Sequence, residues 1–216
     1  MSAREANRLL GHIAAALVVF TVTAFALKVI VHPERAARYT PLVTFHAVTM
    51  FAWMSLLASQ AYLASAGRMK LHRWFGAVSL ALVAALSVSG AIVSIDIGRE
   101  FGRPEVTIVN IAAFVTFIPL YVAAIAFARK RKMHAHRQAM LIGTLAFMTP
   151  VYARVTDVLG LPPQVAIGLQ PPLTIAITLG YEWAALRRVS KATAAMLAFS
   201  VAVVLAMVAV LAMWFV

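Results

Sequence analysis

Long apolar runs, separated by short charged clusters, constrain this chain more than any other feature. Most of these runs reach the length of about 20 residues that an α-helix needs to cross a bilayer. The composition agrees, because 63% of the 216 residues are hydrophobic and only 12% are charged. Soluble domains carry about twice that charged fraction. The sequence therefore predicts an all-α, polytopic helical bundle embedded in a membrane.

Seven apolar runs are expected to form a single transmembrane domain over residues 1–216. The first run is too long for the apolar segment of a typical signal peptide, so we expect it to remain as a span. Thirteen Lys and Arg residues fall between spans on one side and four on the other. The positive-inside rule therefore places the N-terminus in the cytoplasm and the C-terminus outside, with a bacterial inner membrane favoured. The expected spans are 9–31, 42–66, 75–98, 106–128, 139–161, 163–186 and 192–216.

Several functional classes find no support in the sequence. The net charge of +12 comes mainly from residues between the spans, which is typical of membrane topology rather than of nucleic-acid binding. The absence of cysteine excludes disulfides, thiolate metal sites and covalent haem attachment. The GxSxG, HExxH and Walker A motifs are also missing. Whether the protein is an enzyme stays open.

Polar residues inside the expected spans gather toward the outer side. Within hydrocarbon each must find a partner or face water. Arg154 and Asp157 are three residues apart, so they share one helix face and are expected to neutralise each other. One interpretation is a self-satisfied packing pair, and the other is an outward-facing pocket for a ligand, proton or ion. The residues that would line this pocket are His46, Asn110, Arg154, Asp157 and Gln170.

The inner end of the sixth expected span carries Tyr181, Glu182 and Trp183. Aromatic residues at this depth are typical of the interfacial belt of membrane proteins. We expect Glu182 to pair with Arg187 just outside the span.

Two basic turns share a pattern in which a Met is followed three residues later by His-Arg. The two patterns lie 64 residues apart, and the same offset carries His46 onto Asn110. The spacing has two interpretations: two successive helix pairs of the same orientation are related by duplication, or the match is a coincidence. The residues concerned are Met69, His72 and Arg73 in the first turn, and Met133, His136 and Arg137 in the second.

The histidines of these turns have two interpretations. They are solvated residues of topology-setting loops, or they are ligands of a b-type haem, which neutral imidazoles bind on facing helices of a bundle. His72 and His136 would be the axial ligands, with His134 as the alternative to His136. Arg73 and Arg137 would then neutralise the haem propionates.

The stretch from FHAVTMFAW to AIVSI, within residues 45–95, resembles two core helices of the cytochrome b561 family. The matching residues are His46, Met50, Arg68, His72 and Gly90. The HRxxG loop at 72–76 and the HRxxM loop at 136–140 also resemble a family of bacterial membrane proteins of unknown function. This second resemblance covers more of the chain and implies no activity.

Cytochromes b561 hold two haems with four histidines on four successive helices. The resemblance implies that His46 is an outer ligand, that His72 is an inner ligand, and that His136 or His134 is its partner. Asn110 stands where the second outer ligand is expected. At most one haem, near the cytoplasmic face, is therefore implied.

Three functions follow from these patterns. The first is electron transfer through one b-type haem, with quinol in the bilayer or another redox subunit as partner. The second is an accessory or assembly subunit of a larger membrane complex. The third is a transporter or sensor built around the outer pocket.

Overall fold

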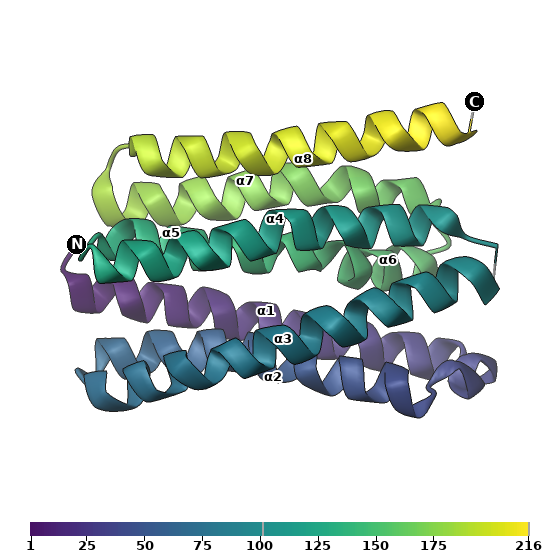
Figure 1. Ribbon diagram of the computed structural model, residues 1–216, viewed down its shortest axis with the longest axis horizontal. Helices are drawn as coiled ribbons and strands as arrows, with labels where there is room; N and C mark the ends of the chain where they lie inside the picture. Colours follow the sequence, from purple (N-terminus) through teal and green to yellow (C-terminus); the bar gives the residue numbers. More distant parts are fainter. Residues whose placement is uncertain (101, 216) are drawn as a thin grey trace. The chain divides into compact units, whose positions relative to one another are not determined.

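The computed structural model describes residues 1–100 and 102–215, and within them every regular element is a helix (Figure 1). The prediction of an all-helical protein is thus confirmed. The elements are α1 Ala3–Val31, η1 Pro33–Arg38, α2 Pro41–Ser65, α3 Met69–Glu100, α4 Pro104–Arg129, α5 Met133–Leu145, η2 Ala146–Met148, α6 Thr149–Val158, α7 Pro163–Leu186 and α8 Lys191–Phe215.

Six helical segments in the described residues are long and apolar enough to cross a membrane, which makes this a multi-pass membrane protein. Five are single helices, and the sixth runs from Met133 to Val158 through α5, η2 and α6. The helix breaks next to Pro150, which offers no amide hydrogen to the carbonyl of Ala146. α7 matches the remaining predicted span in position but is not among these six. Its apolar residues are interrupted by polar side chains: Gln164, Gln170, Thr174, Thr178 and Glu182.

Contacts between α-carbons divide the chain into two compact units, each described here by itself. Unit 1 comprises Met1–Gly90 and Pro150–Ala166. Within it, α1 packs along α2. Gly11 permits their close approach, because a Cβ added there would lie 2.9 Å from the Tyr62 ring. Phe20 of α1 also meets Tyr152 of α6, with ring centroids 6.1 Å apart.

Unit 2 comprises Ala91–Thr149 and Ile167–Val216. Its core gathers apolar side chains from α4, α5, α7 and α8. Gly143 of α5 lies against α4, since a Cβ there would be 3.4 Å from the Phe117 ring. The central members of the core are Leu120, Ala124, Ala139, Ile142, Met196 and Leu197.

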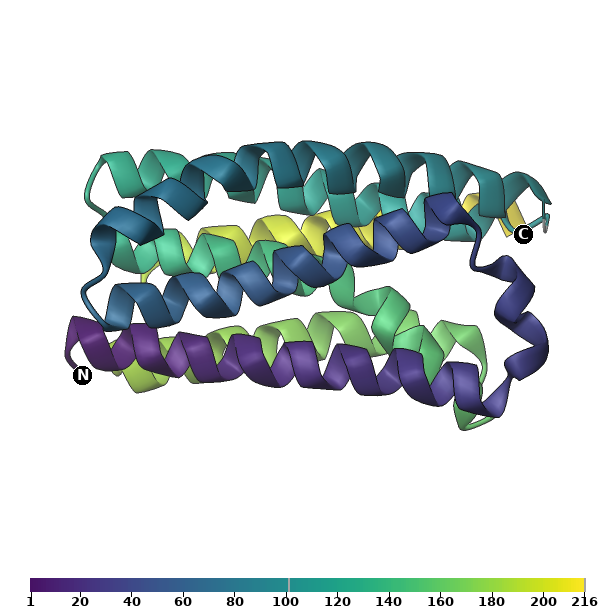
Figure 2. The same cartoon turned by 90° about the horizontal axis from the view of Figure 1, so that it is seen from below.

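Short turns join α2 to α3 and α4 to α5 (Figure 2). Their backbone hydrogen bonds follow the same pattern. Gly67 and Arg131, 64 residues apart, both adopt positive φ, at 73° and 57°. The next residue donates its N–H to the carbonyl five positions earlier, over 2.9 Å for Arg68 and 2.8 Å for Lys132. This is the Schellman ending of a helix. The predicted offset of 64 therefore relates two turns that are alike in structure.

The comparison of the two turns predicts opposite effects at Gly67 and Arg131. Arg131→Gly is expected to stabilise the protein by about 0.5–1 kcal/mol, because glycine adopts positive φ without a steric penalty. Gly67→Ala is expected to destabilise it by a similar amount. Unfolding of both variants in mixed detergent micelles checks the prediction. Equal midpoints for the two variants would contradict it.

Candidate functional site

The two His-Arg turns hold their histidines in the same way. His72 donates its Nδ1–H to the carbonyl oxygen of Gln60 over 3.2 Å. His136 donates its Nδ1–H to the carbonyl oxygen of Ala124 over 2.9 Å. In both turns the acceptor lies 12 residues earlier, on the preceding helix. With Nδ1 acting as the donor, the neutral imidazole carries its lone pair on Nε2.

This tautomer is the one that a metal-binding histidine adopts, because its second ring nitrogen usually donates to a carbonyl or carboxylate. Both imidazoles are partly buried. The same bond also fastens one helix of a hairpin to the other, so by itself it is compatible with a structural role. His72 belongs to unit 1 and His136 to unit 2.

Gln60, whose backbone carbonyl binds His72, also has an unsatisfied side chain. Its amide nitrogen and oxygen are both buried, and neither has a hydrogen-bond partner among the described residues. A buried amide without partners is costly, at about 1–3 kcal/mol for each unsatisfied group. A polar group from outside the chain would satisfy it.

His134 has a different partner from His136. Its Nε2 lies 2.5 Å from the Glu182 carboxylate, and its ring stacks on Tyr181 with an interplanar angle of 2°. Because Nε2 is engaged by Glu182, His136 is the better candidate for an axial ligand in this turn.

Glu182 is the centre of a buried polar cluster in unit 2. Its side chain is fully buried and accepts hydrogen bonds from three segments of the chain. The amide of Ser190 donates over 2.8 Å and the hydroxyl of Thr193 over 2.9 Å. The side-chain amide of Gln138 and the ring of His134 complete the set. The sequence predicts Arg187 as the partner, so the structure corrects the assignment for Glu182.

Asp157 in unit 1 is the centre of an ion-pair cluster at the end of α6. It pairs with Lys28 of α1 and, over 3.1 Å, with Arg35 of η1. The His32 ring lies 3.7 Å away. These partners come from segments more than 120 residues distant in sequence, which is why the helical spacing of Arg154 and Asp157 predicts a different pair.

Glu34 lies outside the membrane-spanning segments and borders this cluster. A hydrogen bond from its own backbone amide, together with one from His32 over 3.1 Å, lowers the pKa of its carboxyl. The carboxylate therefore stays ionised near neutral pH beside Arg35, which lies 3.5 Å away.

Arg154 has no carboxylate within 4 Å among the described residues of unit 1. Its guanidinium donates to the carbonyl oxygen of Pro150 over 2.6 Å and lies 3.8 Å above the centre of the Phe25 ring. His46 donates to, or accepts from, the Ser89 hydroxyl over 3.1 Å. Unit 1 thus contains His46, Arg154 and Asp157 of the predicted pocket.

The other two predicted pocket residues, Asn110 and Gln170, belong to unit 2. Gln170 is buried, accepts a hydrogen bond from Thr149 over 3.2 Å and donates to the carbonyl oxygen of Leu145 over 3.4 Å. Gln170 therefore bridges α7 to the break between α5 and α6.

The Asp157 cluster supports a stability prediction. Asp157→Asn removes the negative charge that Lys28 and Arg35 share, and Lys28 is only 13% exposed. We expect a loss of about 1–2 kcal/mol, less than for a fully buried pair because Asp157 itself is 42% exposed. Unfolding in detergent measures it, with Glu34→Gln as the exposed control. An unchanged midpoint for Asp157→Asn would contradict the assignment of these partners.

The function of this protein is therefore inferred from the geometry of its sites, because comparison with known proteins identifies no relative. No family model, no curated protein and no solved structure matches this chain.

Proposed function

We propose that this chain is a multi-pass membrane protein of electron transfer, which binds one b-type haem near the cytoplasmic face with His72 and His136 as axial ligands. The observation that carries the proposal is the shared hydrogen bond of these imidazoles, in which each Nδ1 contacts a backbone carbonyl 12 residues earlier. The side-chain amide of Gln60, the residue whose carbonyl binds His72, has no partner among the described residues, and this supports the proposal further.

A b-type haem would supply one-electron chemistry, and the surrounding polarity would set its potential. The contribution of the chain is to hold both imidazoles neutral and in fixed orientation. Arg73 and Arg137 follow the two histidines directly and provide cations for the haem propionates. Quinol in the bilayer, or a subunit of a redox complex, is the proposed electron partner.

The proposed topology has seven spans, with the N-terminus in the cytoplasm and the C-terminus outside. α7 is included because its polar side chains Thr178 and Glu182 are buried inside unit 2 rather than exposed to lipid. We expect alkaline phosphatase fused to the C-terminus to be active in a bacterial host, and a fluorescent protein fused there to stay dark. The opposite result would place the C-terminus inside and contradict the proposed topology.

Haem content tests the proposed function. The protein is to be expressed in a haem-replete host, purified in detergent and assayed as its pyridine haemochrome. The proposal expects about one b-type haem for each chain. A well-folded preparation without haem would rule it out, and would leave the His-Arg turns with a structural and topological role.

A second candidate function is recognition of an anionic ligand in unit 1, as in a transporter or sensor. It is favoured by the Arg154 guanidinium, which binds only a carbonyl and an aromatic face although an intramembrane charge usually marks a functional site. Thermal unfolding in phosphate, sulfate or acetate tests it. Stabilisation by one of these anions in the wild type but not in Arg154→Gln supports the site, and equal behaviour in all of them excludes it.

A further inference from the structure

Two turns of unit 2, one joining α4 to α5 and the other joining α7 to α8, are rich in cations and lie at the same end of the unit (Figure 1). Their cationic side chains are all exposed, and none forms an ion pair with a carboxylate among the described residues. We call this surface the basic end of unit 2. Its cations are Arg129, Lys130, Arg131, Lys132, Arg187, Arg188 and Lys191.

Buried contacts hold the two turns together. The Glu182 carboxylate lies 2.5 Å from Nε2 of His134, in the first turn of α5. It also accepts a hydrogen bond over 2.8 Å from the amide of Ser190, in the turn between α7 and α8. Phe127 near the end of α4 and Ala192 at the start of α8 pack against the same apolar core. The cations of both turns are therefore gathered on one surface.

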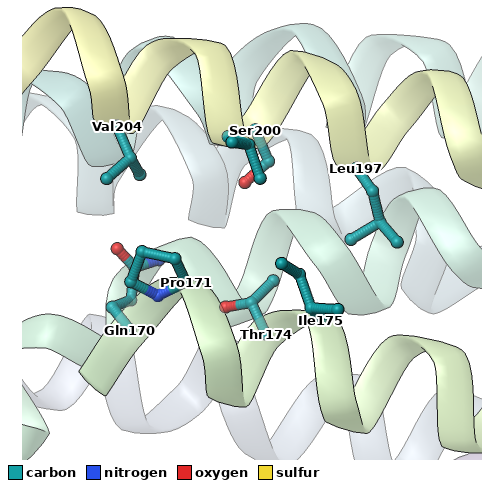
Figure 3. A pocket seen from close by; sticks show the side chains of 8 residues that line it. Gln170, Pro171, Thr174, Ile175, Leu197, Ser200 and Val204 are labelled. Carbon is teal, nitrogen blue, oxygen red and sulfur yellow. The ribbon is translucent and has the colours of Figure 1, made fainter. Parts of the chain in front are cut away.

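The helices that meet at these turns place the basic end at the level of the membrane surface. α4 and α8 are long and apolar enough to cross a membrane, and α5 begins a third such segment. α7 packs beside α8, with Ile175 and Leu197 lining the narrow cleft between them (Figure 3). Trp183, one turn before the end of α7, is 55% exposed, as is typical of side chains at headgroup depth.

The acidic residues of unit 2 do not neutralise this end. Asp96, Glu100 and Glu105 lie toward the connection between α3 and α4. The length of α4, about 39 Å at 1.5 Å per residue, separates that connection from the basic end. Glu182 is fully buried and already binds donors of the chain. The basic end thus carries an uncompensated positive charge.

Two arginines of the basic end occupy backbone positions that favour glycine. Arg131 and Arg187 have φ of 57° and 55°, whereas the other described residues with positive φ are all glycines. Arginine is less stable than glycine in this conformation, because its Cβ crowds the backbone. Residues kept in such a conformation often serve a function. The two side chains that carry this strain are both cations of the same surface.

We propose that the basic end of unit 2 binds the phosphate headgroup of an anionic phospholipid. Guanidinium and ammonium groups form charge-assisted hydrogen bonds with phosphate, and cations beside membrane spans attract anionic lipids. Met133 and Val189 stand among the cations and are 42% and 51% exposed, which suits contact with the acyl chains of a lipid. With the proposed topology, the lipid belongs to the cytoplasmic leaflet. The site does not depend on the proposed haem.

Lipid binding in neutral detergent tests the proposal. Native mass spectrometry of the purified chain measures its affinity for dioleoylphosphatidylglycerol and for dioleoylphosphatidylcholine, which has the same acyl chains but no net charge. We expect the anionic lipid to bind about tenfold more tightly. Equal affinities would overturn the proposal. Inorganic phosphate that protects the chain from thermal unfolding as well as the anionic lipid does would also overturn it, by assigning the site to free anions.

The double variant Arg131→Gly with Arg187→Gly separates the role of the cations from the stability of the fold. It relieves two strained positions, so it should unfold in neutral detergent no earlier than the wild type. Its affinity for the anionic lipid should nevertheless fall about tenfold, with the affinity for phosphatidylcholine unchanged. A loss of binding without a loss of stability excludes misfolding as its cause.

Two further pairs control for charge and for backbone conformation. Arg4→Gln with Arg8→Gln removes two exposed cations of α1, in unit 1, and should change the affinity by less than about twofold because distant exposed charges are screened. Lys130→Gln with Lys132→Gln removes two cations of the basic end at negative φ, −83° and −86°, and should weaken binding as the glycine pair does. Unchanged affinity in both pairs of the basic end would overturn the proposal, and so would an equal loss in the α1 pair.

Discussion

Glu182→Ala is expected to produce the largest loss of stability of any single substitution considered for this protein. The carboxylate accepts hydrogen bonds from His134, Gln138, Ser190 and Thr193, and it is fully buried. Its removal leaves several donors without an acceptor in the interior of unit 2. We expect a loss of about 3–5 kcal/mol, or about 10 °C in melting temperature for a chain of this size.

Two further variants separate the charge of Glu182 from its size. Glu182→Gln keeps an acceptor oxygen but adds an amide that faces existing donors, so about half of the loss is expected. Glu105→Ala removes a partly exposed carboxylate whose partner is Arg103, 2.7 Å away, and should cost less than about 1 kcal/mol. If Glu182→Ala and Glu105→Ala unfold at the same midpoint, the polar cluster around Glu182 does not stabilise unit 2.

The second large effect is expected for the histidines of the two turns. His72→Ala and His136→Ala should each abolish at least nine-tenths of the haem absorbance of the purified protein, because a haem bound through two imidazoles loses one of its iron ligands. The chain should remain folded, since the hydrogen bond from each imidazole to a backbone carbonyl contributes only about 1 kcal/mol. Visible absorbance normalised to protein concentration measures this.

His134→Ala and His12→Ala provide controls with different expectations. His12 is exposed and lies beside Tyr62, so its substitution should leave both colour and stability unchanged. His134→Ala should keep the haem and lower the melting temperature, because Nε2 of His134 is hydrogen-bonded to the Glu182 carboxylate. Loss of colour in His134→Ala together with its retention in His136→Ala would reverse the assignment of the ligand in this turn.

The sequence predicts the helices well but places several of their beginnings too late. The span expected from residue 75 belongs to a helix that begins at Met69, and the span expected from 139 begins at Met133. A hydropathy window detects only the apolar part of a helix and misses a polar first turn. The positive-φ residues Gly67 and Arg131 end the preceding helices, and the new helices begin two residues later. His72 and His136 therefore lie on helices, where their side chains can reach the preceding helix.

The partners of the charged residues could not be predicted in the same way. Asp157 is joined to α1 and η1, and Glu182 to α5 and α8. Helical spacing identifies neighbours within one helix, such as Arg154 and Asp157, but not the segment that packs across from them. Helical spacing does predict that four polar residues of α7 share one face, because they recur at intervals of four in an apolar run. They are Gln170, Thr174, Thr178 and Glu182. Together with Gln164, Pro171 and Pro172, these residues lower the mean hydropathy of α7.

The most direct test of the haem proposal is the visible spectrum of the wild-type protein, purified from a haem-replete host and recorded before and after dithionite. The proposal predicts a Soret band that shifts and an α band that sharpens on reduction, as expected for a b-type haem with two imidazole ligands. A folded, colourless protein whose spectrum does not respond to dithionite would contradict it.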